Sequence, residues 1–155
     1  SGQAARARSV YEVALSRSPD YLPLYDALAR LLITDLGDFQ AAHSVLVQAK
    51  AALALPQNSR DAAEHAHQES IIYRNLGMLD YFAEQYDAAL VDLDHADAVS
   101  DRDDRNVLQY LGMTYAALER REEKCRTWQR LNTFDPSFAE QYSWLAGELT
   151  DCNIQ

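Results

Sequence analysis

Apolar residues recur along most of this chain at spacings of three and four, which is the period of an amphipathic α-helix. The pattern is clearest in residues 73–96. There, Gly77 lies on the contact face of a first helix, a polar turn follows, and Ala89, Leu93 and Ala96 recur on one face of a second helix over residues 86–99. Small residues at such positions let two helix backbones approach closely. A helix pair of this kind cannot bury its apolar faces alone, so the pattern predicts neighbouring pairs.

The arrangement occurs three times along the chain. Leu111-Gly112 repeats Leu76-Gly77 roughly one repeat period of 34 residues later. Matching positions are Tyr115, Trp128, Leu131 and Pro136 in the third copy, and Tyr25, Leu28, Ala29, Leu32, Phe39, Ala42, Leu46 and Ala49 in the first. Such self-similarity indicates a stack of helix pairs, each in contact with its neighbours.

These copies resemble the tetratricopeptide repeat, whose signature is W-x2-L-G-x2-Y, then A-x3-F, then P. The resemblance covers nearly the whole chain, and it implies an all-α fold: a right-handed superhelix of antiparallel helix pairs. Some positions depart from the signature. Asp80, Lys124 and Asp101 replace a tyrosine, an alanine and a proline, while Glu84 and Glu119 occupy the place of the turn glycine. These departures weaken individual contacts without changing the repeat assignment.

With this period the chain divides into a half repeat at 4–17, repeats at 21–55, 59–99 and 102–133, and a capping helix at 137–150. In the half repeat, Ala7, Tyr11 and Ala14 match a second helix whose first helix is missing. Its apolar face would have nothing to cover it. We therefore expect the chain to be a fragment of a longer protein, or to meet another chain at this face.

The middle repeat has a longer first helix than its neighbours. Residues 59–69 keep a helical pattern and add about three turns. This extension is either a polar overhang that joins two repeats or an added wall beside the groove. At other helix ends, Asp20 is predicted as an N-cap, Gly37 as a left-handed end, and residues 100–104 as a capping cluster.

Composition and charge exclude several classes of function. The 155 residues fit one domain, and 24 acidic against 14 basic residues give a net charge of −10. This charge argues against nucleic acid and against an anionic membrane surface as partners. No apolar run is long enough to span a bilayer, so no membrane insertion is expected.

The cysteine content bears on the compartment. Cys125 and Cys152 are too few for a disulfide framework, so a reduced, cytoplasmic setting is expected, with Cys125 as a small packed hydrophobe. A cleaved export signal would leave no trace in this sequence, and export stays open.

The sequence contains no recognisable set of residues for catalysis. Its glycines are scattered rather than gathered in a phosphate-binding loop, and no G-x-S-x-G motif occurs. His65 and His67 lie on different faces of a helix, and the acids at 101–104 lack the glycine and distal glutamate of a calcium loop. Asp92, Asp94 and His95 are expected on the solvated, outward side of a second helix. We therefore expect no enzyme activity, no metal and no cofactor.

In the resembled family, first helices line the concave side of the superhelix, and peptides bind in that groove. First-helix residues that packing leaves free form the predicted groove: Asp26, Arg30, Ile33, Thr34, Arg74, Asn75, Met78, Tyr81, Phe82, Asn106, Gln109 and Met113. The methionines offer adaptable apolar contacts, and the arginines can bind a carboxylate. Tyr81 and Phe82 are either anchors for a partner or packing residues between repeats.

The sequence therefore predicts a non-catalytic interaction module that binds a peptide segment of a protein partner. Some members of the resembled family bind the C-terminal carboxylate of chaperones, but only Asn75 fits at the matching positions, so that clamp is not expected. Two other functions stay open. One is a helical accessory or scaffolding domain of a larger enzyme or regulator; the other is self-association through the opening helix, which would give a homo-oligomer.

Overall fold

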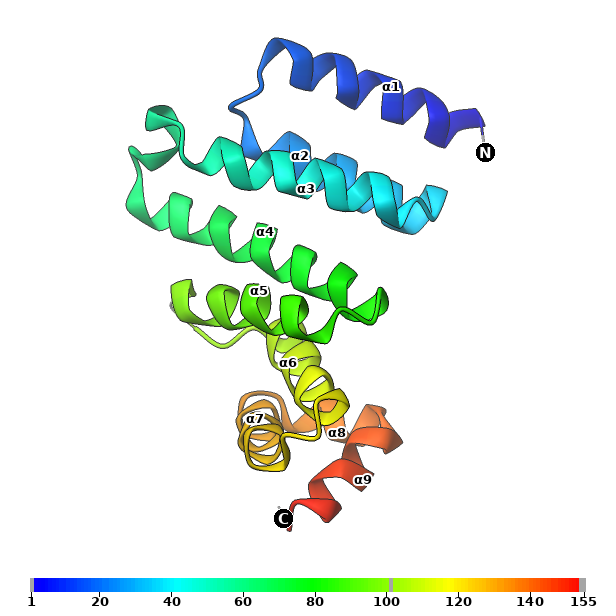
Figure 1. The fold of residues 1–155 in the computed structure, drawn as a ribbon, viewed down its shortest axis with the longest axis vertical. Coiled ribbons are helices and arrows are strands. Elements are labelled where there is room, and N and C mark those ends of the chain that lie inside the picture. Colours follow the sequence, from blue (N-terminus) through cyan, green and yellow to red (C-terminus); the bar gives the residue numbers. More distant parts are fainter. Residues whose placement is uncertain (1, 101, 154–155) are drawn as a thin grey trace.

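Helices follow one another in antiparallel pairs in the computed structural model, which describes residues 2–100 and 102–153 (Figure 1). A leading helix, α1 (Gly2–Arg17), precedes the pairs α2 (Leu22–Leu31) with α3 (Phe39–Leu53), α4 (Ala62–Phe82) with α5 (Tyr86–Val99), and α6 (Arg105–Ala117) with α7 (Arg121–Phe134). Two short helices, α8 (Pro136–Gln141) and α9 (Ser143–Asp151), follow them. A π-helical turn, η1 (Leu32–Leu36), ends α2, and a 3-10 turn, η2 (Pro56–Ser59), precedes α4. The described residues contain no strand, so the predicted all-α class is confirmed.

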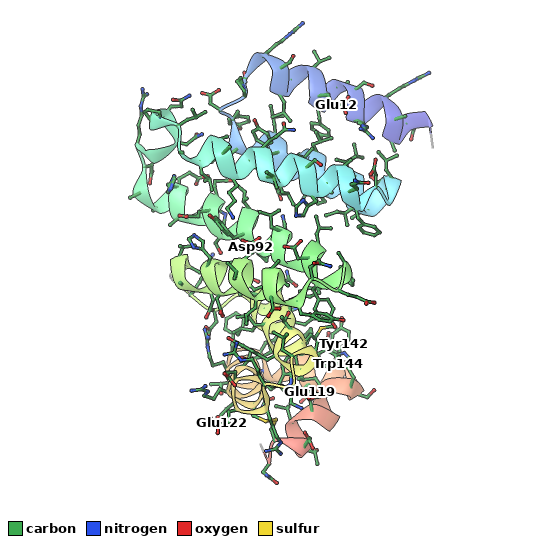
Figure 2. All side chains as sticks on the ribbon, viewed as in Figure 1. Glu12, Asp92, Glu119, Glu122, Tyr142 and Trp144 are labelled. Atoms are coloured by element: carbon green, nitrogen blue, oxygen red, sulfur yellow. A yellow bond between two sulfur atoms is a disulfide. The ribbon has the colours of Figure 1, made fainter. Side chains whose placement is uncertain are left out.

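Neighbouring helices are stacked in chain order. Each of the helices α1 to α8 packs against the next one, and α2 and α6 also contact α4 directly. The first helices of the three pairs therefore share one side of the molecule. Side chains fill the spaces between successive helices (Figure 2). The core is a row of clusters along the stack, which is the expected result when each pair contacts only its neighbours.

Glycines allow the helices of two pairs to approach closely. A Cβ atom added to Gly77 would lie 2.5 Å from Cγ of Leu93 and 3.0 Å from the carbonyl oxygen of Ala89. A Cβ atom added to Gly112 would overlap the indole ring of Trp128. Both glycines are thus at the contact faces that the sequence pattern predicts.

The turns inside the second and third pairs have left-handed residues that are not glycine. Gly37 has φ +63° at the end of η1, as expected, but Glu84 and Glu119 each have φ +58°. After α4, the backbone N–H of Gln85 donates to the Asp80 carbonyl, and the N–H of Glu84 donates to the Tyr81 carbonyl. This pairing is the Schellman motif, which satisfies the last carbonyls of a helix.

Carboxylates cap three of the helix N-termini. Asp104 accepts hydrogen bonds from the backbone N–H groups of Asn106 and Val107, and Asp38 and Asp61 cap α3 and α4 in the same way. The capping role predicted for the 100–104 cluster therefore belongs to Asp104; Asp101 lies outside the described residues. Asp20 is not the N-cap of α2. That position is Tyr21, and the Asp20 carboxylate instead accepts a hydrogen bond from Gln57.

The C-terminal end differs from the single capping helix expected over 137–150. The helix is interrupted at Tyr142, whose backbone is extended with φ −121° and ψ 96°. The interruption lets Phe138 of α8 and Leu145 of α9 both enter the buried cluster around Trp128. Burial of these large apolar side chains outweighs the few helical hydrogen bonds that the break removes.

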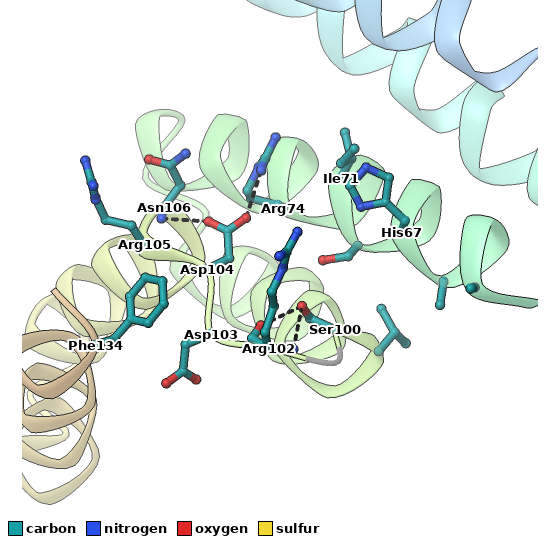
Figure 3. A pocket seen from close by; sticks show the side chains of 14 residues that line it. His67, Ile71, Arg74, Ser100, Arg102, Asp103, Asp104, Arg105, Asn106 and Phe134 are labelled. Carbon is teal, nitrogen blue, oxygen red and sulfur yellow. Dashed lines mark hydrogen bonds and ion pairs between the residues drawn. The ribbon is translucent and has the colours of Figure 1, made fainter.

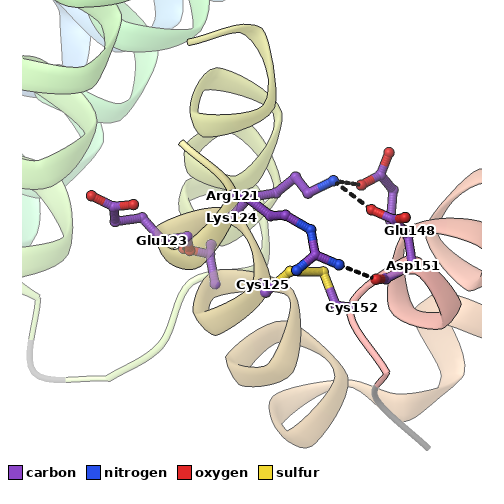
Figure 4. Close-up of a disulfide and its surroundings, with 8 residues drawn as sticks. Arg121, Glu123, Lys124, Cys125, Glu148, Asp151 and Cys152 are labelled. Atoms are coloured by element: carbon purple, nitrogen blue, oxygen red, sulfur yellow. Dashed lines mark hydrogen bonds and ion pairs between the residues drawn. A yellow bond between two sulfur atoms is a disulfide. The ribbon is translucent and has the colours of Figure 1, made fainter. Parts of the chain in front are cut away.

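The expectation that the cysteines are reduced was wrong. Cys125 of α7 and Cys152, at the end of α9, form a disulfide (Figure 4). Beside it, Nζ of Lys124 lies 2.8 Å from Glu148 and 3.2 Å from Asp151 (Figure 4). The two cysteines meet because α9 folds back along α7. Their pairing is a tertiary contact that their spacing alone does not reveal.

A candidate interaction surface on the first helices

Polar side chains link the three first helices across their shared side. Nδ2 of Asn75 on α4 donates to Oδ1 of Asp26 on α2 over 3.2 Å. Nη1 of Arg74 lies 2.9 Å from Oδ2 of Asp104, directly before α6 (Figure 3). Of the predicted groove residues, the structure thus joins Asp26, Arg74 and Asn75 in one line across the stack.

The two predicted groove arginines differ in their surroundings. Arg74 is half-buried; besides Asp104, its Nε donates to Oδ1 of Asn75 over 3.4 Å. Its guanidinium is therefore engaged within the chain. Arg30 is exposed, and none of the described carboxylates is paired with it. Arg30 remains available to a partner's carboxylate, whereas the guanidinium of Arg74 is already bonded to Asp104 and Asn75.

Aromatic rings gather where the C-terminal end of α4 meets α6. The ring centroids of Tyr81, Phe82 and Tyr110 lie 5.7–5.8 Å from one another. Tyr81 is half-buried against the central core cluster, and burial raises the pKa of its phenol. Phe82, by contrast, is 60% exposed. Tyr81 thus packs between repeats and Phe82 presents its ring to solvent.

Tyr110 was not among the predicted groove residues. It occupies the position in the third repeat that Asn75 occupies in the second, so the repeat alignment carried the signal that this side chain faces the first-helix side. Burial raises the pKa of its phenol, with a smaller contribution from Tyr81.

The remaining predicted positions fall into two groups. Ile33 is half-buried against the N-terminal core cluster, and Met113 is half-buried against the C-terminal one. Thr34, Met78, Asn106 and Gln109 retain solvent exposure; Thr34 bonds to the Arg30 carbonyl, and Gln109 contacts Sδ of Met113 at 3.9 Å. The first-helix side is therefore a mixed polar and apolar surface.

The second helices are less solvated than expected. Asp92 of α5 is buried, and its carboxylate lies 3.4 Å from Nζ of Lys50 on α3. His95 lies 2.8 Å from Glu69 on α4, and its ring stacks on Tyr73 with centroids 3.9 Å apart. The expectation of solvated surface residues was wrong for Asp92 and His95, because both link neighbouring helices, whereas Asp94 is exposed as expected.

Within residues 2–100 and 102–153, no three histidine, cysteine, aspartate or glutamate side chains are grouped so that they could hold a metal ion. None of the helices in this part of the chain has both the length and the apolar character needed to cross a membrane.

The stacked antiparallel pairs, with their first helices on one side, define a helical solenoid of the tetratricopeptide-repeat type. Neither a protein-family model nor a curated protein matches the sequence. Solved structures do match. The crystal structure of MamA superposes with a TM-score of 0.76 and 16% identity over 99% of this chain and 81% of that one. TTC0263, a thermophilic TPR protein in Thermus thermophilus, gives a TM-score of 0.67 and 19% identity over 96% of this chain and 74% of that one. These likenesses show the fold.

Proposed function

We propose that this chain is a non-catalytic module that binds a peptide segment of a protein partner along the concave side formed by α2, α4 and α6. The main support is Phe82, a large apolar ring that is 60% exposed beside the half-buried rings of Tyr81 and Tyr110. Exposed aromatic side chains next to a rigid support are frequent binding hot spots, because they bury much area at little entropic cost.

Other residues of the first helices would supply the rest of such a site. Arg30 offers an exposed cation, and Met78 offers an adaptable apolar contact. The hydrogen bond between Asn75 and Asp26 fixes the positions of these two polar side chains. A peptide along this side would meet apolar contacts near the end of α4 and hydrogen-bonding groups near its middle.

A matched pair of substitutions tests the proposal. Peptides selected from a random display library on the purified chain are measured against Phe82→Ala and against Val91→Ala, which truncates a 69% exposed side chain on α5. Phe82→Ala is expected to weaken binding by about 2 kcal/mol, a typical hot-spot value. Val91→Ala is expected to leave it unchanged. Equal effects from both, or no selected peptide at all, contradict the proposal.

Self-association is a second candidate. Val10 and Val13 are exposed on α1 and form an apolar patch with Ala14. A second copy that covered this patch would remove it from water. Light scattering over a concentration series tests this: a mass that rises with concentration, and does not rise for Val10→Glu, supports it, and a constant monomer mass excludes it.

We further infer an oxidising setting in place of the cytoplasmic one expected from the sequence. Cytosolic thiols are kept reduced, whereas a structural disulfide such as Cys125–Cys152 persists in exported proteins. Alkylation of intact cells that make the protein, followed by its intact mass, tests this. Cysteines that resist the reagent support the inference, and two alkylated cysteines contradict it.

A further inference from the structure

A cleft of about 610 Å³ lies beside the first-helix side, between α4 and the segment that leads into α6 (Figure 3). One wall is a single face of α4 from Ala63 to Arg74, and the other consists of residues 99–100 and 102–106 with Phe134. The cleft depends on the length of α4, which has 21 residues against 13 in α6 and 10 in α2. From the extension at 59–69, Ala63, Ala66 and His67 line this cleft.

The acidic groups at this cleft are already paired. Asp104 caps α6 and binds Arg74 at 2.9 Å, and Asp103 forms an ion pair with Arg130 of α7. Two basic side chains remain. Among the described residues, neither Arg102 nor His67 has an ion-pair partner, and in Figure 3 the Arg102 side chain extends toward the middle of the cleft. Other described arginines, such as Arg30, also lack an ion-pair partner, but Arg102 lies at this cleft.

The rest of the lining is apolar or small. Ile71 projects from the α4 wall, Phe134 lies across from it, and Val99 and two alanines complete the apolar part (Figure 3). The volume is that of an ordinary ligand pocket, enough for one or two side chains and too small for a whole helix. Arg74 and Asn106 line the cleft and also belong to the predicted groove, so a peptide on the first-helix side would run directly into it.

We propose that this cleft binds a partner segment in which an aspartate or glutamate side chain lies next to a bulky apolar one. The carboxylate pairs with Arg102, and the apolar side chain packs between Ile71 and Phe134. Charge complementarity favours an acidic side chain in the partner, because the described acids at the cleft, Asp103 and Asp104, already pair with arginines of this chain and leave Arg102 unpaired. The inference rests on the proposed peptide-binding function and names the chemistry of one part of it.

Two pairs of variants test this inference with the intact chain. Ala63→Trp fills the cleft, whereas Ala62→Trp places the same ring on an adjacent exposed residue outside it. Arg102→Glu reverses the charge of the unpaired side chain at the cleft, whereas Arg126→Glu reverses the charge of an exposed arginine on α7 that lies outside it. All four residues are exposed, so the helix content of each variant should match that of the parent.

The probe is a random peptide-display library selected on the unmodified chain, followed by synthesis of the selected peptides. We expect an acid next to leucine, isoleucine, phenylalanine or tryptophan, and dissociation constants that rise about tenfold or more with Ala63→Trp and Arg102→Glu. Both control variants should bind as the parent does.

The outcomes separate the two proposals. Peptides that bind, respond to Phe82→Ala and ignore both cleft variants would overturn the cleft and leave the groove intact. Selected peptides without acidic enrichment would also overturn the cleft. Failure to select any peptide would overturn both proposals together.

Discussion

Single backbone positions decide how tightly these helices can turn and stack. Glu84 and Glu119 adopt the left-handed conformation that the resembled repeat usually gives to glycine. The sequence identified these two positions correctly as the turn sites, because the repeat period fixes them. It could not show that glutamate would keep the same conformation, because helix packing on both sides enforces it against the residue's own preference.

Replacing Glu84 with glycine should therefore stabilise the protein. A side chain in the left-handed region costs about 1 kcal/mol, and glycine removes that cost. Chemical denaturation should show a gain of about this size. The control is Asp87→Gly, an exposed acid in the first turn of α5, which should lose stability because glycine is a poor helix former. A loss with Glu84→Gly would show that the glutamate side chain has a stabilising role of its own.

The two glycines of α6 and α9 give opposite expectations for the same substitution. Gly112→Ala would force a methyl group against Trp128 and should cost about 1–3 kcal/mol. Gly147→Ala meets nothing within 4 Å and lies inside a helix, so it should add about 0.5–1 kcal/mol. Thermal unfolding of both variants checks this. Similar melting temperatures for the two would mean that Trp128 moves aside freely.

Tyr115 links α6 to α5 by donating its phenol proton to Asp94 over 3.1 Å. Burial, together with the nearby Asp94 carboxylate, raises the pKa of Tyr115 to about 12. Since the folded pKa exceeds the ordinary value near 10, this contribution to stability is complete below about pH 10 and is lost as the pH rises toward 12. Tyrosinate absorbance should show a late ionisation that Tyr115→Phe removes and Asp94→Asn shifts to lower pH. If the late ionisation persists in Tyr115→Phe, it belongs to another tyrosine and the prediction is wrong.

At the scale of elements, the local hydrophobic periodicity predicted helix positions, because these depend mainly on residues close in sequence. The second helix expected over residues 86–99 is α5 with the same bounds. The sequence did not predict the break at Tyr142 or the disulfide, because both depend on how α8 and α9 pack against α7. The engagement of Arg74 by Asp104, a contact between residues 30 positions apart, was missed for the same reason.

The disulfide should stabilise the C-terminal end in particular. It joins residues 27 positions apart, and closing a loop of this size contributes about 3 kcal/mol through the unfolded chain. Cys152→Ser should lower the melting temperature and speed amide exchange in α8 and α9 while α1 to α5 keep their protection, since each repeat contacts only its neighbours. The double serine variant serves as control, because a reductant should not change it further. Faster exchange along the whole chain would contradict this local role.

At the scale of the whole molecule, the repeat pattern predicted the architecture, which the structure confirms, whereas the side on which a partner binds stays a prediction. Stacking places α2, α4 and α6 together, and the contacts from Asn75 to Asp26 and from Arg74 to Asp104 cross that side. The pattern could not show which side chains on the first helices would be used in packing between repeats. Tyr81 and Met113 pack inward, whereas Phe82 and Arg30 stay exposed, and only the three-dimensional arrangement separates them.

The most direct measurement is amide hydrogen exchange of the full chain with and without a peptide selected on it. The account predicts slower exchange in α2, α4 and α6 and unchanged exchange in α3, α5 and α7. Protection confined to the second helices, or to α1, would contradict binding along the first-helix side.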